Sequence, residues 1–230
     1  MAEEGRFGFE DEGYDFPFYN NNPHVPKWGW IVLFFALVIG FALSISVKIH
    51  FSILGCIIMI VPVLYFLKWD YKAIFRIPSG KDILLAVALF IGYLLYAVVI
   101  DLALAQFGIV SDGIVDPATL TYMDLITPIF SIMGEEFMKF IPFVFFLRLI
   151  YKYSKNRKLS VIASVALVMV MFASLHAYNP VMFVFALFVQ GLGSIFEYIG
   201  YIKTKNILVS YITHLLTDEF IFLVLLLGVA

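Results

Sequence analysis

The sequence predicts an all-α polytopic membrane protein, a bundle of about seven transmembrane helices. Hydrophobic residues make up 63% of the 230 residues, charged residues make up 14%, and the mean hydropathy is +0.98. These values are too apolar for the core of a soluble protein of this length. Apolar stretches long enough to cross about 30 Å of hydrocarbon also recur along the chain, and basic residues gather on one side of them.

Seven apolar stretches approach the length of about 20 residues that a membrane-spanning helix requires. They cover residues 28–47, 51–67, 83–107, 125–150, 159–178, 181–202 and 207–229. The second stretch is short and contains Pro62, so a re-entrant or tilted helix also fits its sequence. Only Asn179 and Pro180 separate the fifth and sixth stretches. This break predicts a tight helical hairpin, because proline disfavours helix in the residue before it.

The basic residues predict the orientation of the chain. If the amino end lies in the cytoplasm, the inner loops contain nearly all of the basic residues, whereas the outer loops contain Lys48. An odd number of spans preserves this asymmetry, so we expect the carboxyl end outside and a multi-pass protein of the cell membrane.

Three parts are expected along the chain. Residues 1–27 are acidic and aromatic and lack the pattern of a cleaved signal, which predicts a disordered cytoplasmic tail. A short segment that folds against the membrane surface is the alternative. Residues 28–107 are expected to form accessory transmembrane helices, and residues 120–230 the core of the protein, which carries the polar motifs described below. The single cysteine, Cys56, gives no basis for a disulfide or a cysteine-based metal site, and no basic patch predicts a nucleic-acid partner.

Ionisable residues within the apolar stretches indicate where function lies. Glu135 and Glu136 fall in the fourth stretch, His176 in the fifth and His214 in the seventh. A charged group at this depth disfavours insertion by roughly 2.5–3.5 kcal/mol, so such groups tend to persist only where they are used.

Side chains four residues apart share one face of a helix. Three pairs have this spacing: Glu135 with Lys139, Phe172 with His176, and His214 with Asp218. We therefore expect each of the three helices to present one polar face to the interior. Glu136 is rotated by about 100° from Glu135, so the two glutamates should have separate partners.

The order and spacing of these motifs resemble those of the CPBP (Abi) intramembrane endopeptidases. That family carries EExxxR, FxxxH and HxxxN or HxxxD on successive helices. The corresponding segments here are EEFMKF, FASLH and HLLTD, and the resemblance covers residues 120–230. Phe140 stands at the position of the family's arginine, with Lys139 beside it. The EExxK pattern also resembles that of the PrsW-type membrane proteases, which have glutamate in the middle motif where this chain has His176.

The resemblance implies an intramembrane endopeptidase that hydrolyses a membrane-associated or prenylated polypeptide with glutamate-activated water. The implied catalytic residues are Glu135, Glu136, His176, His214 and Asp218, and the supporting residues are Lys139 and Phe172. Burial disfavours the charged form of a carboxyl group, which suits Glu135 as the general base. His214 would stabilise the oxyanion, with Asp218 setting its tautomer. His176 would orient the water, and Lys139 would hold Glu136 or Glu135 in its charged form.

Other interpretations remain open for the same residues. No cofactor is expected, but zinc is an alternative, because Glu135, His176 and His214 would form a legitimate catalytic ligand set. A non-proteolytic immunity protein, scaffold or proton-coupled transporter would use the polar cluster for binding. Outside the motifs, Asp101, Glu197 and Tyr198 are expected to be structural or water-facing.

The expected depths of these side chains in the membrane differ, which makes a direct contact among them harder to reach. At about 1.5 Å per residue, Glu135 falls near the midplane, His176 near the outer end of its helix, and His214 closer to the inner surface. They would meet only if a helix is tilted or extends beyond its apolar stretch.

Overall fold

The computed structural model describes residues 17–19, 25–45, 48–110 and 120–227, and all regular secondary structure in these residues is helical. This confirms the predicted all-α class. Within these described ranges, six helical segments are long and apolar enough to cross a membrane. The helix α4, which is 27 residues long, is not among the six, because charged side chains are spread along it. The total of seven spans and the orientation of the ends stay predictions. Most of the predicted tail, residues 1–27, lies outside the described residues.

The helices follow the predicted stretches closely. Six of them are continuous: α1 (Lys27–Ser44), α2 (Ile49–Phe66), α3 (Gly80–Ala105), α4 (Pro128–Ser154), α5 (Arg157–Leu175) and α8 (Ile207–Leu226). The sixth stretch is composite: α6 (Pro180–Ala186), the π-helical turn η4 (Leu187–Gly191), the 3₁₀ turn η5 (Leu192–Ser194) and α7 (Ile195–Thr204). Two further 3₁₀ turns are η1 (Tyr71–Ala73) and η3 (Tyr122–Leu125). Pro62 lies inside α2 without ending it, so this stretch is one regular helix.

Asparagine side chains begin three of the helices. Asn156, Asn179 and Asn206 each accept a hydrogen bond from a backbone N–H in the first turn of α5, α6 and α8, respectively. Such caps satisfy amides that have no partner within the helix. The cap at Asn179 stands between the end of α5 and the start of α6, which confirms the predicted break. Helices α4 and α7 both end at a lysine with left-handed backbone, directly before the next capping asparagine.

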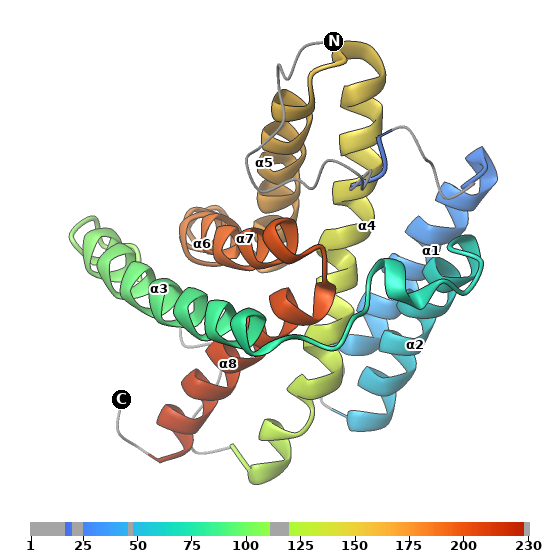
Figure 1. Cartoon of the computed structure of the whole chain (residues 1–230). Helices are drawn as coiled ribbons and strands as arrows, with labels where there is room; N and C mark the ends of the chain where they lie inside the picture. Colours follow the sequence, from blue (N-terminus) through green and yellow to red (C-terminus); the bar gives the residue numbers. More distant parts are fainter. Residues whose placement is uncertain (1–16, 20–24, 46–47, 111–119, 228–230) are drawn as a thin grey trace.

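Helix α4 is the central element of the bundle. It packs against α1 and α2 on one side and against α5 and α8 elsewhere, while α3 lies across α7 and α8 (Figure 1). The fully buried side chains Phe137, Phe143 and Leu147 of α4 belong to the main hydrophobic core. The glutamates and Lys139 are therefore carried into the middle of the protein by the helix with the most neighbours.

Small residues let the helices approach closely at two places. A β-carbon on Gly55 of α2 would lie 2.5 Å from the carbonyl oxygen of Gly40 in α1. A β-carbon on Gly191 would lie 2.8 Å from the carbonyl oxygen of Met169 in α5. Glycine at these positions permits the close backbone packing that holds membrane helices together. It also brings the composite segment that carries Glu197 against α5.

The segment before α3 is fastened to the turn between α7 and α8. The backbone N–H of Ile207 donates to the carbonyl of Ile74 at 2.9 Å. The Asn206 amide donates to the carbonyl of Arg76 at 2.7 Å and accepts from its N–H at 3.2 Å. The Arg76 guanidinium also donates to carbonyls at the end of α7. These bonds fix the start of α8, the helix that carries His214.

Replacing Asn206 by alanine removes both the cap of α8 and the two bonds to Arg76. A cap stabilises by about 1 kcal/mol and a net hydrogen bond by about 1 kcal/mol, so we expect a loss of about 2–3 kcal/mol in the free energy of unfolding. Unfolding in mixed detergent micelles measures this loss. The matched control is Asn156→Ala, which removes a cap alone and should lose about 1 kcal/mol. Equal losses in the two variants would contradict a role for the fastened segment.

Candidate active site

His214 lies at the centre of a cluster of ionisable side chains. Its Nδ1 is 2.8 Å from Oε1 of Glu136. Its Nε2 is 3.9 Å from Oε2 of Glu135 and 3.8 Å from Oδ2 of Asp218. The imidazole ring therefore separates two groups of residues. We call the Nδ1 side, with Glu136, Lys139, Glu197 and Ser210, the buried half, and the Nε2 side, with Glu135 and Asp218, the open half.

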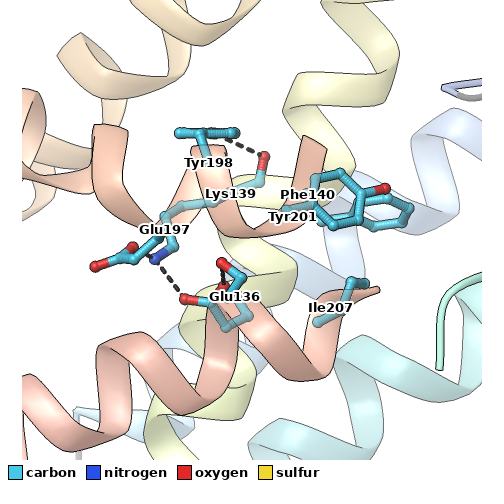
Figure 2. A pocket seen from close by; sticks show the side chains of 8 residues that line it. Glu136, Lys139, Phe140, Glu197, Tyr198, Tyr201 and Ile207 are labelled. Carbon is cyan, nitrogen blue, oxygen red and sulfur yellow. Dashed lines mark hydrogen bonds and ion pairs between the residues drawn. The ribbon is translucent and has the colours of Figure 1, made fainter. Parts of the chain in front are cut away.

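The Lys139 ammonium occupies the middle of the buried half. Its Nζ is 2.5 Å from Oε1 of Glu136, donates a hydrogen bond to Oε2 of Glu197, and lies 3.2 Å from Nδ1 of His214. Figure 2 shows the lysine side chain directed between the two carboxylates. The Ser210 hydroxyl donates to Oε2 of Glu136. Glu136, Lys139 and Glu197 each expose only 3% to 6% of their surface, so these charges depend on one another for stability.

Three helices supply the buried half, and spacing within each helix sets the local geometry. Glu136 and Lys139 are three residues apart on α4, and Ser210 and His214 are four residues apart on α8, so each pair shares a face. Glu197 comes from the first turn of α7. The packing of α7 and α8 against each other brings these faces together.

A small cavity opens beside the Lys139 ammonium. It is lined by Glu136, Lys139, Phe140, Glu197, Tyr198, Tyr201, Ile207 and Ser210 (Figure 2). The space that the centre of a water molecule can occupy is about 20 Å³. One water needs roughly 10–15 Å³, so the buried half has room for about one water and none for a peptide.

The open half is accessible and its polar groups are not in direct contact. The side chains of Glu135 and Asp218 are 25% and 33% exposed, whereas that of His214 is 8% exposed. Separations of 3.8–3.9 Å from Nε2 are too long for direct hydrogen bonds. They are short enough for one water or one substrate oxygen to contact the groups together.

His176 lies beyond Phe172 on α5. Its Nδ1 is 2.9 Å from the carbonyl oxygen of Phe172, and the centres of the two rings are 4.6 Å apart. The Phe172 ring in turn is 6.5 Å from the ring of His214 and 5.1 Å from Nζ of Lys139. Among the contacts of the described residues, none joins His176 to Glu135 or His214. The depth argument from the sequence agrees with this separation.

The structure changes two of the expected pairings. Lys139 was paired by its spacing with Glu135, but its partners are Glu136, which was the alternative, and Glu197. Asp218 was expected to set the tautomer of His214, but the nitrogen that makes a close contact is Nδ1, and its partner is Glu136.

Glu197 is the site residue that sequence reasoning missed. It is buried and ion-paired, rather than water-facing as one expectation had it. Its signal was present, since an acidic residue within an apolar stretch is what singled out Glu135. It was passed over because it belongs to no motif. Of the two residues grouped with it, Asp101 is exposed, and the Tyr198 hydroxyl donates to the carbonyl of Lys139 at 3.4 Å.

Ligand atoms of Glu136, Glu197 and His214 lie within 4.8 Å of one another, a spacing that suits a metal ion. This set differs from the zinc set expected from the sequence and lacks His176. The Lys139 ammonium contacts an atom of each of the three residues. It therefore occupies the place that a metal ion would need, and the residues present do not fit a metal there.

Helices long and apolar enough to cross a membrane surround buried carboxylates and an imidazole, which together define a multi-pass membrane protein with a polar cluster in its interior. The family model described as "Type II CAAX prenyl endopeptidase Rce1-like" matches residues 117–220. Over these residues the chain is similar to the Rce1-like proteins of the CPBP (Abi) family, which confirms the resemblance drawn from the motifs. This is a protease family, and the match supports a CAAX-type intramembrane endopeptidase in general. No curated protein and no solved structure matches the chain.

Replacing Lys139 by methionine leaves two carboxylates buried without their cation. Removing one partner of a buried ion pair destabilises by about 3–5 kcal/mol, so we expect a loss of that size in the free energy of unfolding. The double variant with Glu197→Gln should recover part of the loss, because one of the stranded charges is then absent. Unfolding of the wild type, both single variants and the double variant in mixed micelles measures the coupling. Strictly additive effects would contradict the ion pair.

Proposed function

We propose that the chain is an intramembrane endopeptidase of the cell membrane that cleaves a prenylated or otherwise membrane-associated polypeptide with water activated by Glu135. One observation carries the proposal: Glu135 and Asp218 flank Nε2 of His214 at 3.9 and 3.8 Å, in the partly exposed half of the site. The prenylated class of substrate is supported by the family that residues 117–220 match.

The reaction begins with a water molecule shared by Glu135 and His214. Two atoms 3.9 Å apart can both lie about 2.8 Å from one water. Glu135 takes a proton from this water as the oxygen attacks the carbonyl carbon of the peptide bond. Glu135 then returns the proton to the leaving amine as the carbon–nitrogen bond breaks, so the products are a carboxylic acid and an amine.

The oxyanion of the tetrahedral intermediate needs a donor fixed in advance. Nε2 of His214 has this role in the proposal, because it faces the open half, while Glu136 holds the ring from the other side through Nδ1. Asp218 lies 3.8 Å from Nε2, so one water can join the two in the resting enzyme, and the carboxylate favours a ring nitrogen that carries its proton on this side. His176 keeps the role of orienting the water, which requires its ring to leave the carbonyl of Phe172.

The proposed reaction uses no metal ion. The observation in support is that the ammonium of Lys139 contacts the three residues that would otherwise hold a cation.

Replacing Glu135 by glutamine removes the base while keeping the size of the side chain. We expect cleavage of a farnesylated CAAX peptide in proteoliposomes to fall by roughly 100- to 10,000-fold. The matched control is Asp101→Asn, the same chemical change at an exposed position of α3, which should leave cleavage unchanged. An active Glu135→Gln variant would exclude the base assignment. A wild-type protein that cleaves neither prenylated nor unprenylated peptides would favour the non-proteolytic alternatives.

Exhaustive chelation followed by dialysis should leave the cleavage rate unchanged. The same assay is run on protein treated in parallel without chelator. Loss of activity that added zinc restores, in a protein that keeps its helical content, would contradict the metal-free mechanism.

A further inference from the structure

Glu197 has no counterpart in the three motifs, yet its carboxylate lies within the active-site cluster. It hydrogen bonds to the Lys139 ammonium, and its Oε2 is 3.9 Å from Nδ1 of His214. The chain also departs from the family pattern nearby, because Phe140 stands where the arginine is expected and Lys139 supplies the cation one position earlier. The buried carboxylate of Glu197 therefore contacts the cation that stands in place of the family's arginine.

The charges of the buried half do not balance without His214. Glu136 and Glu197 contribute two negative charges, and Lys139 contributes one positive charge. An excess charge in a buried site is unfavourable unless a neighbouring group compensates it. His214 lies next to this excess negative charge, since its Nδ1 is 2.8 Å from Oε1 of Glu136 and 3.9 Å from Oε2 of Glu197. An imidazolium ring would make the buried half neutral.

The hydrogen bonds of the ring lead to the same result. A carboxylate only accepts, so Nδ1 donates its proton to Glu136. A neutral ring carries one proton, and Nε2 would then be bare and unable to donate to an oxyanion. The proposed mechanism needs a proton on both nitrogens. The net charge of the groups around the ring decides whether Nε2 carries this second proton.

We propose that Glu197 is a positioning residue whose negative charge keeps His214 protonated on both nitrogens, so that Nε2–H faces the open half as the oxyanion donor. This inference rests on the proposed function. Without Glu197 the buried half contains the Glu136–Lys139 pair, which is neutral, and nothing there favours the second proton.

The other groups around His214 do not replace this charge. They come from the helices packed against α8 and from α8 itself: Glu135, Glu136 and Lys139 from α4, Tyr93 from α3, which lies near Asp218 and Glu197, and Asp218 from α8. The turn η3, which also packs against α8, carries Asp124, whose carboxylate accepts hydrogen bonds from Thr121. Glu135 and Asp218 are partly exposed, so solvent screens them more than it screens Glu197. The positive charge of Lys139 opposes protonation of the ring. The negative charge of Glu136 is already compensated by Lys139, whose Nζ lies 2.5 Å from Oε1 of Glu136.

The experiment is ¹⁵N NMR of histidine-labelled protein in lipid nanodiscs, which reports the protonation of each ring nitrogen. The chain has four histidines, and His214→Gln assigns the signal of interest. We expect an imidazolium for His214 in the wild type at about pH 8, where an unperturbed histidine is neutral. In Glu197→Gln the ring should titrate at least about one pH unit lower. Glu197→Asp, which keeps the charge, and the control Asp101→Asn should both retain the imidazolium.

Cleavage measurements give a second, independent result. In Glu197→Gln we expect kcat to fall about tenfold or more with little change in KM, because the interaction is made in the transition state. The alkaline limb of the pH profile of kcat should also move to lower pH, and Glu197→Asp should restore both. A residue that only stabilises the fold would not move this limb.

The outcomes separate this inference from the proposed function. A neutral His214 in the wild type, or an unchanged titration in Glu197→Gln, overturns the role of Glu197 even if the enzyme cleaves peptides. A wild type that cleaves no peptide but holds His214 as an imidazolium overturns the proposed function alone. If Glu197→Gln does not fold, the wild-type spectrum and the Glu197→Asp variant still decide the question.

Discussion

The arrangement of the site depends on one ammonium group buried between two carboxylates. Lys139 on α4 joins Glu136 on the same helix to Glu197 on α7, and it lies beside His214 on α8. Buried charges of this kind are stable only when each has its partner. The three helices are therefore tied together at the level of the site, and the position of the imidazole follows from the position of the lysine.

This network gives the two nitrogens of His214 different surroundings. Nδ1 faces Glu136 and Lys139, which line a cavity with room for about one water, and Nε2 faces partly exposed carboxylates. A ring held firmly from one side and free on the other suits acid–base chemistry, because its orientation does not depend on the substrate. The same division explains how two neighbouring glutamates can differ in role: Glu136 holds the ring, and Glu135 meets the solvent and, in the proposed mechanism, the nucleophilic water.

The chain also achieves a site of this kind with an altered motif. Lys139 has a shorter reach and a more compact charge than an arginine, and it lies one residue earlier than the family's arginine. From that position it reaches Glu136 three residues before it and Glu197 across the helix interface. Phe140 instead contributes its ring to the aromatic packing with Tyr201. An acid on α7 is then the natural complement to a lysine on α4.

The sequence by itself determined the class and the helices, and it singled out most of the ionisable residues that the structure gathers around His214. Apolar length predicted each helix to within a few residues, because a membrane leaves a backbone few other ways to satisfy its hydrogen bonds. Spacing on single helices placed Glu135, His214 and Asp218 on faces that do meet. The spacing of residues along one helix does not show which helices lie against each other or at what depth in the bundle. The tertiary structure decided both. It made Glu136 the close partner of His214, brought Glu197 into the cluster, and left His176 behind Phe172. Periodicity describes one helix at a time, whereas these contacts arise between helices whose tilt and depth are set by packing.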